Sequence, residues 1–198
     1  MNDMTQIINL LNEIEMLSAI PRSGFAFLGS GSQSIAEHSY QATLVAYVLA
    51  RLYPQPLDMH KLVMMCLFHD LPEARIGDLN YFQKKYVAPR LDKALEDIEK
   101  ASFLGPEIVA FIKEYEEGKT PEAQLAHDAD QLELFLILKQ EEERGNKKAA
   151  EWMANLTKRL QTDIGKQVAE AIRQTPSDAW WHQNKSDPHW IDGGKGKP

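Results

Sequence analysis

The sequence predicts an all-α fold, and three observations support that prediction. Apolar residues recur at spacings of three and four in almost every stretch between turn residues, the period of an amphipathic helix. Residues typical of helix N-caps precede several of these stretches. No run of alternating β-branched residues competes as a strand, and no internal repeat is present. We therefore expect a bundle of helices.

Turn and capping residues set the expected boundaries of the helices. Ser34 and Glu37 form a capping box, Asp58 can cap the next helix, and Thr120 with Pro121 supplies an N-cap and an N1 proline. The expected helices, caps included, cover residues 4–17, 34–53, 58–68, 88–104, 106–117, 121–144, 146–160 and 165–174. Segment 62–68 is apolar almost all round, which predicts a central position in the bundle. Residues 22–33, rich in Gly and Ser, predict a loop.

The helical pattern ends near residue 175, which predicts one domain over residues 1–175 and a tail over residues 176–198. Three of the four tryptophans, Trp180, Trp181 and Trp190, lie in this tail. We expect their indoles to dock on the helical body or on a sister subunit, since chain ends are ordered mainly when something ties them down. A lid over a pocket is the alternative. Residues 193–198 are expected to be disordered.

Composition excludes several classes of protein. The 198 residues carry a net charge of −7, which argues against a binder of nucleic-acid polymers, because such proteins usually carry a basic patch. The single cysteine, Cys66, lies in an apolar run and is expected to be a buried, inert thiol. No segment is long and apolar enough for a membrane span, and the first residues lack the pattern of a signal peptide. We therefore expect a cytoplasmic protein without a membrane partner.

Two histidines and two aspartates predict a metal site. His38 lies in the first turn of a helix, His69 and Asp70 close the most apolar helix, and Asp130 lies in a third helix. Side chains from three helices could converge on one divalent cation, and such a set suits Mn²⁺, Fe²⁺, Co²⁺ or Mg²⁺ with open positions better than a closed structural zinc site. Each residue alone is more often a hydrogen-bonded structural residue or a turn former.

Two further carboxylates strengthen the metal hypothesis. Glu73 and Asp78 follow the candidate ligands directly, after the C-terminal end of an apolar helix. Acidic residues are not needed at this position to keep the protein soluble. Gly77 allows a sharp backbone turn that could direct the Asp78 side chain back toward the metal.

With these motifs in place, the chain resembles the HD-domain metal phosphohydrolases, and within them the 5′-deoxynucleotidases. The resemblance rests on five segments in the family's order: Pro21-Arg-Ser-Gly-Phe25, Ile35-Ala-Glu-His-Ser39, Phe68-His-Asp-Leu-Pro-Glu-Ala74, Ile76-Gly-Asp78 and Asp128-Ala-Asp-Gln-Leu-Glu133. It extends in helix pattern over about residues 5–174. It implies an HD-domain helical bundle with one divalent ion where three helices converge. Mn, Co, Mg, Fe and Zn all remain candidates for that ion.

The resemblance also implies the ligand set His38, His69, Asp70 and Asp130. A second His–Asp dipeptide occurs at His127, but it lacks the preceding apolar helix and the acids that follow the first one.

Helical phase disagrees with the resemblance over the fourth ligand. Asp128 falls nearer the stripe of Leu125, Ala129 and Leu132, whereas Asp130 projects on the side of Leu134. The helix is apolar on most faces, so phase discriminates poorly here, and we follow the motif to Asp130.

The resemblance implies a phosphomonoesterase that hydrolyses deoxynucleoside 5′-monophosphates. Glu73 would protonate the leaving oxygen or relay a proton, and Asp78 would orient the attacking water or the sugar 3′-hydroxyl. Arg22 would neutralise the phosphate, since its fork matches two oxygens. Some relatives place a Trp directly after this arginine to exclude ribonucleotides. Here Ser23 follows, and Phe25 is the nearest aromatic residue.

Two other hypotheses for the function remain open. The same metal site could serve a nucleoside triphosphate, a cyclic dinucleotide or another small phosphate ester, and a triphosphate would need more cations than Arg22 alone. Further cations that could contribute are Arg75, Lys84, Lys85 and Arg90. Alternatively, the chain could be a catalytically silent, nucleotide-binding helical module. The expected partners are a small-molecule nucleotide and a second copy of the chain, because both the resemblance and the apolar surplus of the long helices indicate a homodimer.

Overall fold

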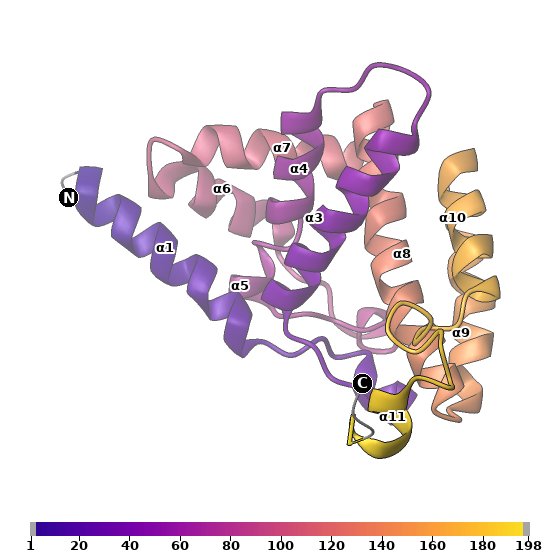
Figure 1. The fold of residues 1–198 in the computed structure, drawn as a ribbon. Helices are drawn as coiled ribbons and strands as arrows, with labels where there is room; N and C mark the ends of the chain where they lie inside the picture. Colours follow the sequence, from indigo (N-terminus) through magenta and orange to yellow (C-terminus); the bar gives the residue numbers. More distant parts are fainter. Residues whose placement is uncertain (1–2, 196–198) are drawn as a thin grey trace.

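A computed structural model describes residues 3–195 and confirms the all-α fold (Figure 1). Its elements are α1 (Asp3–Ala19), α2 (Phe25–Leu28), α3 (Ile35–Leu52), α4 (Met59–Phe68), α5 (Glu73–Ile76), the 3-10 turn η1 (Gln83–Lys85), α6 (Leu91–Ala101), α7 (Gly105–Glu117), α8 (Pro121–Glu143), α9 (Lys147–Thr157), α10 (Asp163–Gln174) and α11 (Pro188–Asp192). Within residues 3–195 extended backbone pairs in one isolated bridge, between Pro21 and Ser34. None of these helices is long and apolar enough to cross a membrane.

Side-chain caps explain where the long helices begin. The Ser34 side chain accepts a hydrogen bond from the Glu37 amide while the Glu37 carboxylate accepts one from the Ser34 amide, a complete capping box. Asp58, Thr120 and Thr162 each accept from a backbone amide in the first turn of α4, α8 and α10. These caps satisfy amides that have no partner inside the helix, so the sequence defines these starts locally.

The central helix of the bundle is α8, which packs against α3, α4, α9 and α10. Its side chains Leu125, Leu132 and Phe135 are fully buried in the larger of two apolar clusters. A second cluster joins α1 to α3, α6 and α7. In Figure 1, α1 slants away from the start of α3 on one side, and α9 and α10 flank α8 on the other. The expected central position of segment 62–68 is met in part, since Leu62 and Met65 are fully buried whereas Leu67 is exposed.

The structure corrects four expected boundaries. The loop 22–33 contains the short helix α2, which buries Phe25 and Leu28 and ends at Gly29 in the left-handed region, φ 85°. The helix expected over 88–104 covers only Leu91–Ala101, because Pro89 disfavours helical geometry at the residue before it and Ser102 adopts extended backbone at the other end. The helix that follows Asn146 ends at Thr157 rather than near residue 160. The last long helix starts two residues early, because Thr162 caps it.

The described part of the tail packs around its own aromatic residues. The rings of Trp181 and Trp190 meet edge to face with centroids 5.5 Å apart, and Ser177 binds the Glu143 carboxylate at the end of α8. All three tail indoles remain at least half exposed, so they do not bury themselves against the helical body. None of them lines the large cavity described below. The disorder expected for residues 193–198 lies partly outside the described residues.

Candidate active site

α3 presents His38 at the centre of the molecule. The side chain is fully buried, and its Nδ1 lies 2.7 Å from Oε2 of Glu133 on α8. The other oxygen of Glu133 accepts a hydrogen bond of 2.6 Å from Gln33. Because Nδ1 is engaged with a carboxylate, the imidazole is oriented with Nε2 pointing away from Glu133.

The C-terminal end of α4 presents the second histidine in the same way. His69 Nδ1 lies 3.0 Å from the carbonyl oxygen of Cys66, one turn earlier in the chain. A carbonyl can only accept, so Nδ1 carries the proton and Nε2 keeps its lone pair. The next residue, Asp70, leaves the helix and turns toward the two imidazoles.

Four side chains from three regions of the fold converge on one point. The Nε2 atom of His38 lies 3.1 Å from Oδ1 of Asp130 and 3.6 Å from Oδ2 of Asp70. His69 Nε2 lies 3.3 Å from the same oxygen of Asp70. One ligand atom each from His38, His69 and Asp130 lies within 4.8 Å of the other two.

The donor set fits a divalent cation. The Nε2 atoms of His38 and His69 are buried, and neither makes a hydrogen bond to any described residue. Buried polar atoms without partners are rare in folded proteins, and here both face carboxylate oxygens around a common centre. Two imidazole nitrogens and two carboxylates suit an ion that accepts mixed nitrogen and oxygen ligands.

The charges around this point are strongly coupled. Burial opposes the charged form of His38, but the nearby carboxylates of Asp130 and Glu133 raise its pKa to about 9. Burial also opposes the charged form of Asp130, yet His38 and Arg22 hold the pKa of that carboxyl well below its usual range. Asp130 is therefore a carboxylate at neutral pH, and a cation at this point would compete with the proton on His38.

The loop before α2 places Arg22 beside both candidate aspartate ligands. Its guanidinium lies 3.2 Å from Asp70 and 4.0 Å from Asp130, and the side chain is 17% exposed. The Arg22 amide donates to the Gln33 carbonyl over 2.8 Å, which ties the two ends of the loop together. A partly exposed guanidinium at the edge of a cavity can bind two oxygens of an oxyanion.

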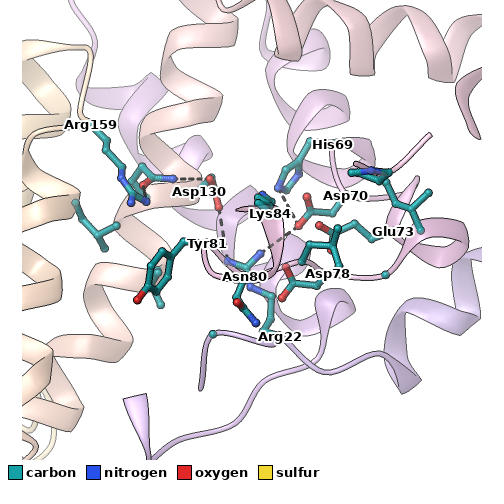
Figure 2. Close-up of a pocket in the computed structure, with 18 of the residues that line it drawn as sticks. Arg22, His69, Asp70, Glu73, Asp78, Asn80, Tyr81, Lys84, Asp130 and Arg159 are labelled. Atoms are coloured by element: carbon teal, nitrogen blue, oxygen red, sulfur yellow. Dashed lines mark hydrogen bonds and ion pairs between the residues drawn. The ribbon is translucent and has the colours of Figure 1, made fainter. Parts of the chain in front are cut away.

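Glu73 and Asp78 lie on the same side of the cavity as Asp70 (Figure 2). Burial, together with the charges of Asp70 and Asp78, raises the pKa of Glu73 to about 9, so this carboxyl holds a proton at neutral pH. One oxygen of Asp78 accepts a hydrogen bond of 2.6 Å from the Ser23 amide. Asp78 therefore also holds the loop that carries Arg22.

These groups line a cavity of about 770 Å³, large enough for a small-molecule substrate. Phe25 is buried in the core and reaches the cavity wall. Of the four additional cations considered for a triphosphate, only Lys84 lines the cavity. Arg75 instead binds Glu13 on α1, and Arg90 pairs with Asp92 on the surface. Figure 2 shows Arg159 of the α9–α10 connection at the opposite end from Glu73.

The structure brings Asp130, and not Asp128, to the candidate metal point. Asp128 is fully buried on another face of α8, where its oxygens accept hydrogen bonds from the Gln161 amide at 2.7 Å and the Thr162 amide at 2.9 Å. The Thr162 hydroxyl donates a third, at 2.5 Å. Asp128 therefore holds the residues that lead into α10, and its oxygens are already occupied by these three hydrogen bonds.

Sequence reasoning missed three residues that position the site. Glu133 orients His38, Gln131 donates a hydrogen bond of 2.6 Å to Asp130, and the Tyr115 hydroxyl lies 3.5 Å from the same carboxylate. A signal for Glu133 was present, because it lies three residues after Asp130 on one helix and so shares its face. Tyr115 follows from no local pattern, since α7 meets α8 only in the folded chain.

A helical bundle with paired histidines, paired aspartates and an arginine at their edge defines a metal-dependent phosphohydrolase. A family model described as "HD domain" matches residues 14–173, and the chain belongs to that family. The chain is 24% identical over 154 residues to the 5′-deoxynucleotidase HDDC2 of Danio rerio, covering 72% of each protein. It is 30% identical over 131 residues to the 5′-deoxynucleotidase HDDC2 of Dictyostelium discoideum, covering 61% of this chain and 69% of that one.

Solved structures agree with this assignment. The PH0347 protein from Pyrococcus horikoshii OT3 superposes with a TM-score of 0.71 at 28% identity, covering 84% of this chain and 98% of the other. A protein described as a predicted metal-dependent phosphohydrolase from Magnetospirillum magnetotacticum MS-1 superposes with a TM-score of 0.70 at 22% identity, covering 87% and 91%. The second likeness bears on the fold alone.

Proposed function

We propose that this HD-domain protein is a metal-dependent phosphomonoesterase that hydrolyses deoxynucleoside 5′-monophosphates to deoxynucleoside and phosphate. One observation carries the proposal. Two imidazole nitrogens without hydrogen-bond partners among the described residues and two carboxylates converge beside the partly exposed Arg22, next to a cavity. Relatives named as 5′-deoxynucleotidases support the choice of substrate. The expected compartment is the cytoplasm.

In this mechanism His38, His69, Asp70 and Asp130 hold one divalent ion. The ion would supply a Lewis acid for a phosphoryl oxygen and lower the pKa of a water molecule. Mn, Co, Mg, Fe and Zn remain candidates, because a mixed nitrogen and oxygen set accepts several ions. Glu133 and the Cys66 carbonyl hold the two imidazoles in the tautomer that leaves Nε2 available.

The protein's own groups bind and orient the phosphate ester. Arg22 binds two phosphate oxygens with its planar fork in place of its present contact with Asp70. Glu73, whose pKa is raised by burial, donates a proton to the departing 5′ oxygen. Asp78 holds the arginine loop through the Ser23 amide and lies where it can orient water or the sugar 3′-hydroxyl. Phe25 supplies an apolar wall of the cavity.

A substrate panel tests the proposal. Protein stripped with a chelator and reloaded with Mn²⁺, Co²⁺ or Mg²⁺ should release phosphate from deoxynucleoside monophosphates, and the stripped protein should not. Asp130→Asn should abolish release, whereas the matched variant Asp128→Asn should leave release per folded molecule intact. Release that persists in Asp130→Asn contradicts the assigned ligand set. Equal rates on ribonucleotides and deoxynucleotides contradict the sugar selectivity but leave the hydrolase.

A triphosphate substrate is the second candidate, and Lys84 is the observation that favours it. Lys84 lines the cavity and has no carboxylate within ion-pair distance in the described chain. If a triphosphate is the substrate, Lys84→Ala should raise its KM about tenfold or more, the loss of one charged contact. If a monophosphate is the substrate, the same variant should change KM little. Metal-loaded protein that binds nucleotides and hydrolyses none would instead be a binding module.

A further inference from the structure

The cavity has a second end that phosphoester hydrolysis does not use. Figure 2 shows Glu73 at one end of the cavity and Arg159 at the other. The wall at the Arg159 end comes largely from α9 and the residues after it, and includes Trp152, Asn155, Leu156 and Arg159. Their spacings of three, one and three place them along one side of this segment. A phosphate group fills only a small part of about 770 Å³, so this end is available to the rest of the substrate.

Trp152 provides an aromatic surface at this end. Its side chain is half-buried and packs against the larger apolar cluster, which fixes its position. A Cβ added at Gly24 would lie 3.9 Å from Cζ3 of the indole, so Trp152 also lies beside the loop that carries Arg22. Leu134 of α8 and Leu156 line the cavity as well. Nucleobases stack on aromatic side chains of this kind, because every base has a π-face.

Arg159 provides the polar group of this end. It is exposed, and its Nη1 donates a long hydrogen bond of 3.4 Å to Oε1 of Gln131, whose Nε2 donates to the Asp130 carboxylate over 2.6 Å. Arg159 is therefore separated from a candidate metal ligand by one side chain. It forms no ion pair with any residue between 3 and 195. A guanidinium carries five N–H donors and no acceptor, so it favours a ligand edge made of acceptors.

We propose that the α9 end of the cavity binds the nucleobase, and that Arg159 makes the protein prefer a 6-oxopurine such as guanine. This inference rests on the proposed function, since it assumes a nucleotide substrate. Guanine presents O6 and N7 as two adjacent acceptors that match the arginine fork, whereas adenine presents an amino donor beside N7. Cytosine also presents an amino group, and thymine a single carbonyl. The base stacks on Trp152, and Arg159 exchanges its long bond to Gln131 for the two acceptors of guanine.

Deoxynucleosides test the base site independently of hydrolysis, because they carry no phosphate. In calorimetric titrations of the metal-loaded full chain, deoxyguanosine should bind about tenfold more tightly than deoxyadenosine. Arg159→Ala should remove this preference by weakening deoxyguanosine binding alone. Lys166→Ala is the matched control, because it removes an exposed cation of α10 that does not line the cavity, and it should change neither affinity. Equal binding of the two nucleosides, no measurable binding of either, or a preference that survives Arg159→Ala overturns the proposal.

Trp152 variants test the stacking surface in the same titrations. Trp152→Ala should weaken both nucleosides about tenfold and leave their ratio unchanged, because stacking does not depend on the edge of the base. Trp152→Phe keeps an aromatic ring and should recover most of the affinity, and circular dichroism verifies the fold of both variants. Unchanged nucleoside binding in folded Trp152→Ala overturns the assigned stacking surface.

A substrate without a base separates this inference from the proposed function. Arg159→Ala should lower kcat/KM for deoxyguanosine 5′-monophosphate about tenfold through KM, and should leave kcat/KM for 2-deoxyribose 5-phosphate unchanged. An equal loss on both substrates would mean that Arg159 acts on Asp130 through Gln131, which overturns the base site. If the wild type hydrolyses neither compound, the proposed function is wrong, and the nucleoside titrations still decide whether the base site exists.

Discussion

His69 and Asp70 end α4 beside the cavity, whereas His127 and Asp128 lie within α8 against α7 and α10. Both pairs are buried or nearly so, and both have the same two residue types in the same order. In the first pair His69 Nε2 has no hydrogen-bond partner among the described residues. In the second pair His127 Nε2 contacts the Tyr115 carbonyl at 2.7 Å, and Asp128 accepts three hydrogen bonds.

The difference teaches that a dipeptide motif does not distinguish a ligand from a structural group. Polar atoms that the fold itself satisfies stabilise the fold, and polar atoms left without partners are available to a ligand. Asp128 holds the start of α10 against α8, and His127 stacks on Tyr115 with ring centroids 4.0 Å apart. The comparison predicts opposite consequences for identical substitutions in the two pairs.

The largest effect is expected for Asp70→Ala on catalysis. Loss of one ligand should reduce phosphate release by on the order of a thousandfold or more, because the remaining side chains would no longer hold the ion that would supply Lewis-acid chemistry. The free energy of unfolding without metal should change by no more than about 1 kcal/mol, since Asp70 lies among other acids. Phosphate assays and urea unfolding of the same preparation measure the two effects. Full activity in Asp70→Ala would contradict the assignment of Asp70 as a metal ligand.

Asp128→Ala should show the reverse pattern. Removing a fully buried carboxylate that accepts three hydrogen bonds should lower the free energy of unfolding by about 3 kcal/mol, because two backbone amides lose their partners. Metal binding and phosphate release per folded molecule should remain those of the wild type. A loss of metal affinity in a folded Asp128→Ala protein would show that the two pairs are not separate in function.

Glu133→Gln tests the support behind the first pair. The carboxylate that orients His38 becomes a neutral amide of the same shape, which should weaken metal affinity by about 10- to 100-fold. Titration of stripped protein with Mn²⁺ or Co²⁺ measures the change. Gln140→Glu, a change on the same helix away from the site, is a control for altered charge, and it should leave the affinity unchanged.

The starts of several helices could be predicted from the sequence, whereas the residues that meet at the site depend on how the helices pack. Helix starts followed from local caps such as Ser34 and Thr120, because a cap is a contact within one turn. The choice of Asp130 over Asp128 depended on which helix packs on each face of α8. Helical periodicity indicates the face on which a residue lies, but it does not indicate which helix packs against that face. The cations Lys84 and Arg75 are nine residues apart, yet only Lys84 lines the cavity, because Arg75 binds α1 instead.

Gly165→Ala tests the contact between Asp128 and the first turn of α10. A Cβ at Gly165 would lie 2.2 Å from an oxygen of Asp128, so the first turn of α10 or the carboxylate must move. The expected cost is about 1 to 3 kcal/mol of unfolding free energy. In the double variant with Asp128→Ala the clash disappears, so the two costs should sum to more than the measured total. Strict additivity would mean that the two residues do not meet.

The smallest effect is expected from His127→Phe, and the same substitution at His69 provides its comparison. His127→Phe keeps a ring stacked on Tyr115 and removes one hydrogen bond to its carbonyl, which still accepts from the Gly118 amide. The cost should be about 1 kcal/mol of unfolding free energy, with metal binding unchanged. His69→Phe also keeps an aromatic ring, but it removes Nε2, which has no hydrogen-bond partner among the described residues, together with the Nδ1 contact to the Cys66 carbonyl. It should therefore abolish the rise in Tm on adding metal, while costing the metal-free protein about 1 kcal/mol of unfolding free energy. If His127→Phe also abolished the rise in Tm, a nitrogen without a hydrogen-bond partner would not explain why only the His69–Asp70 pair binds metal.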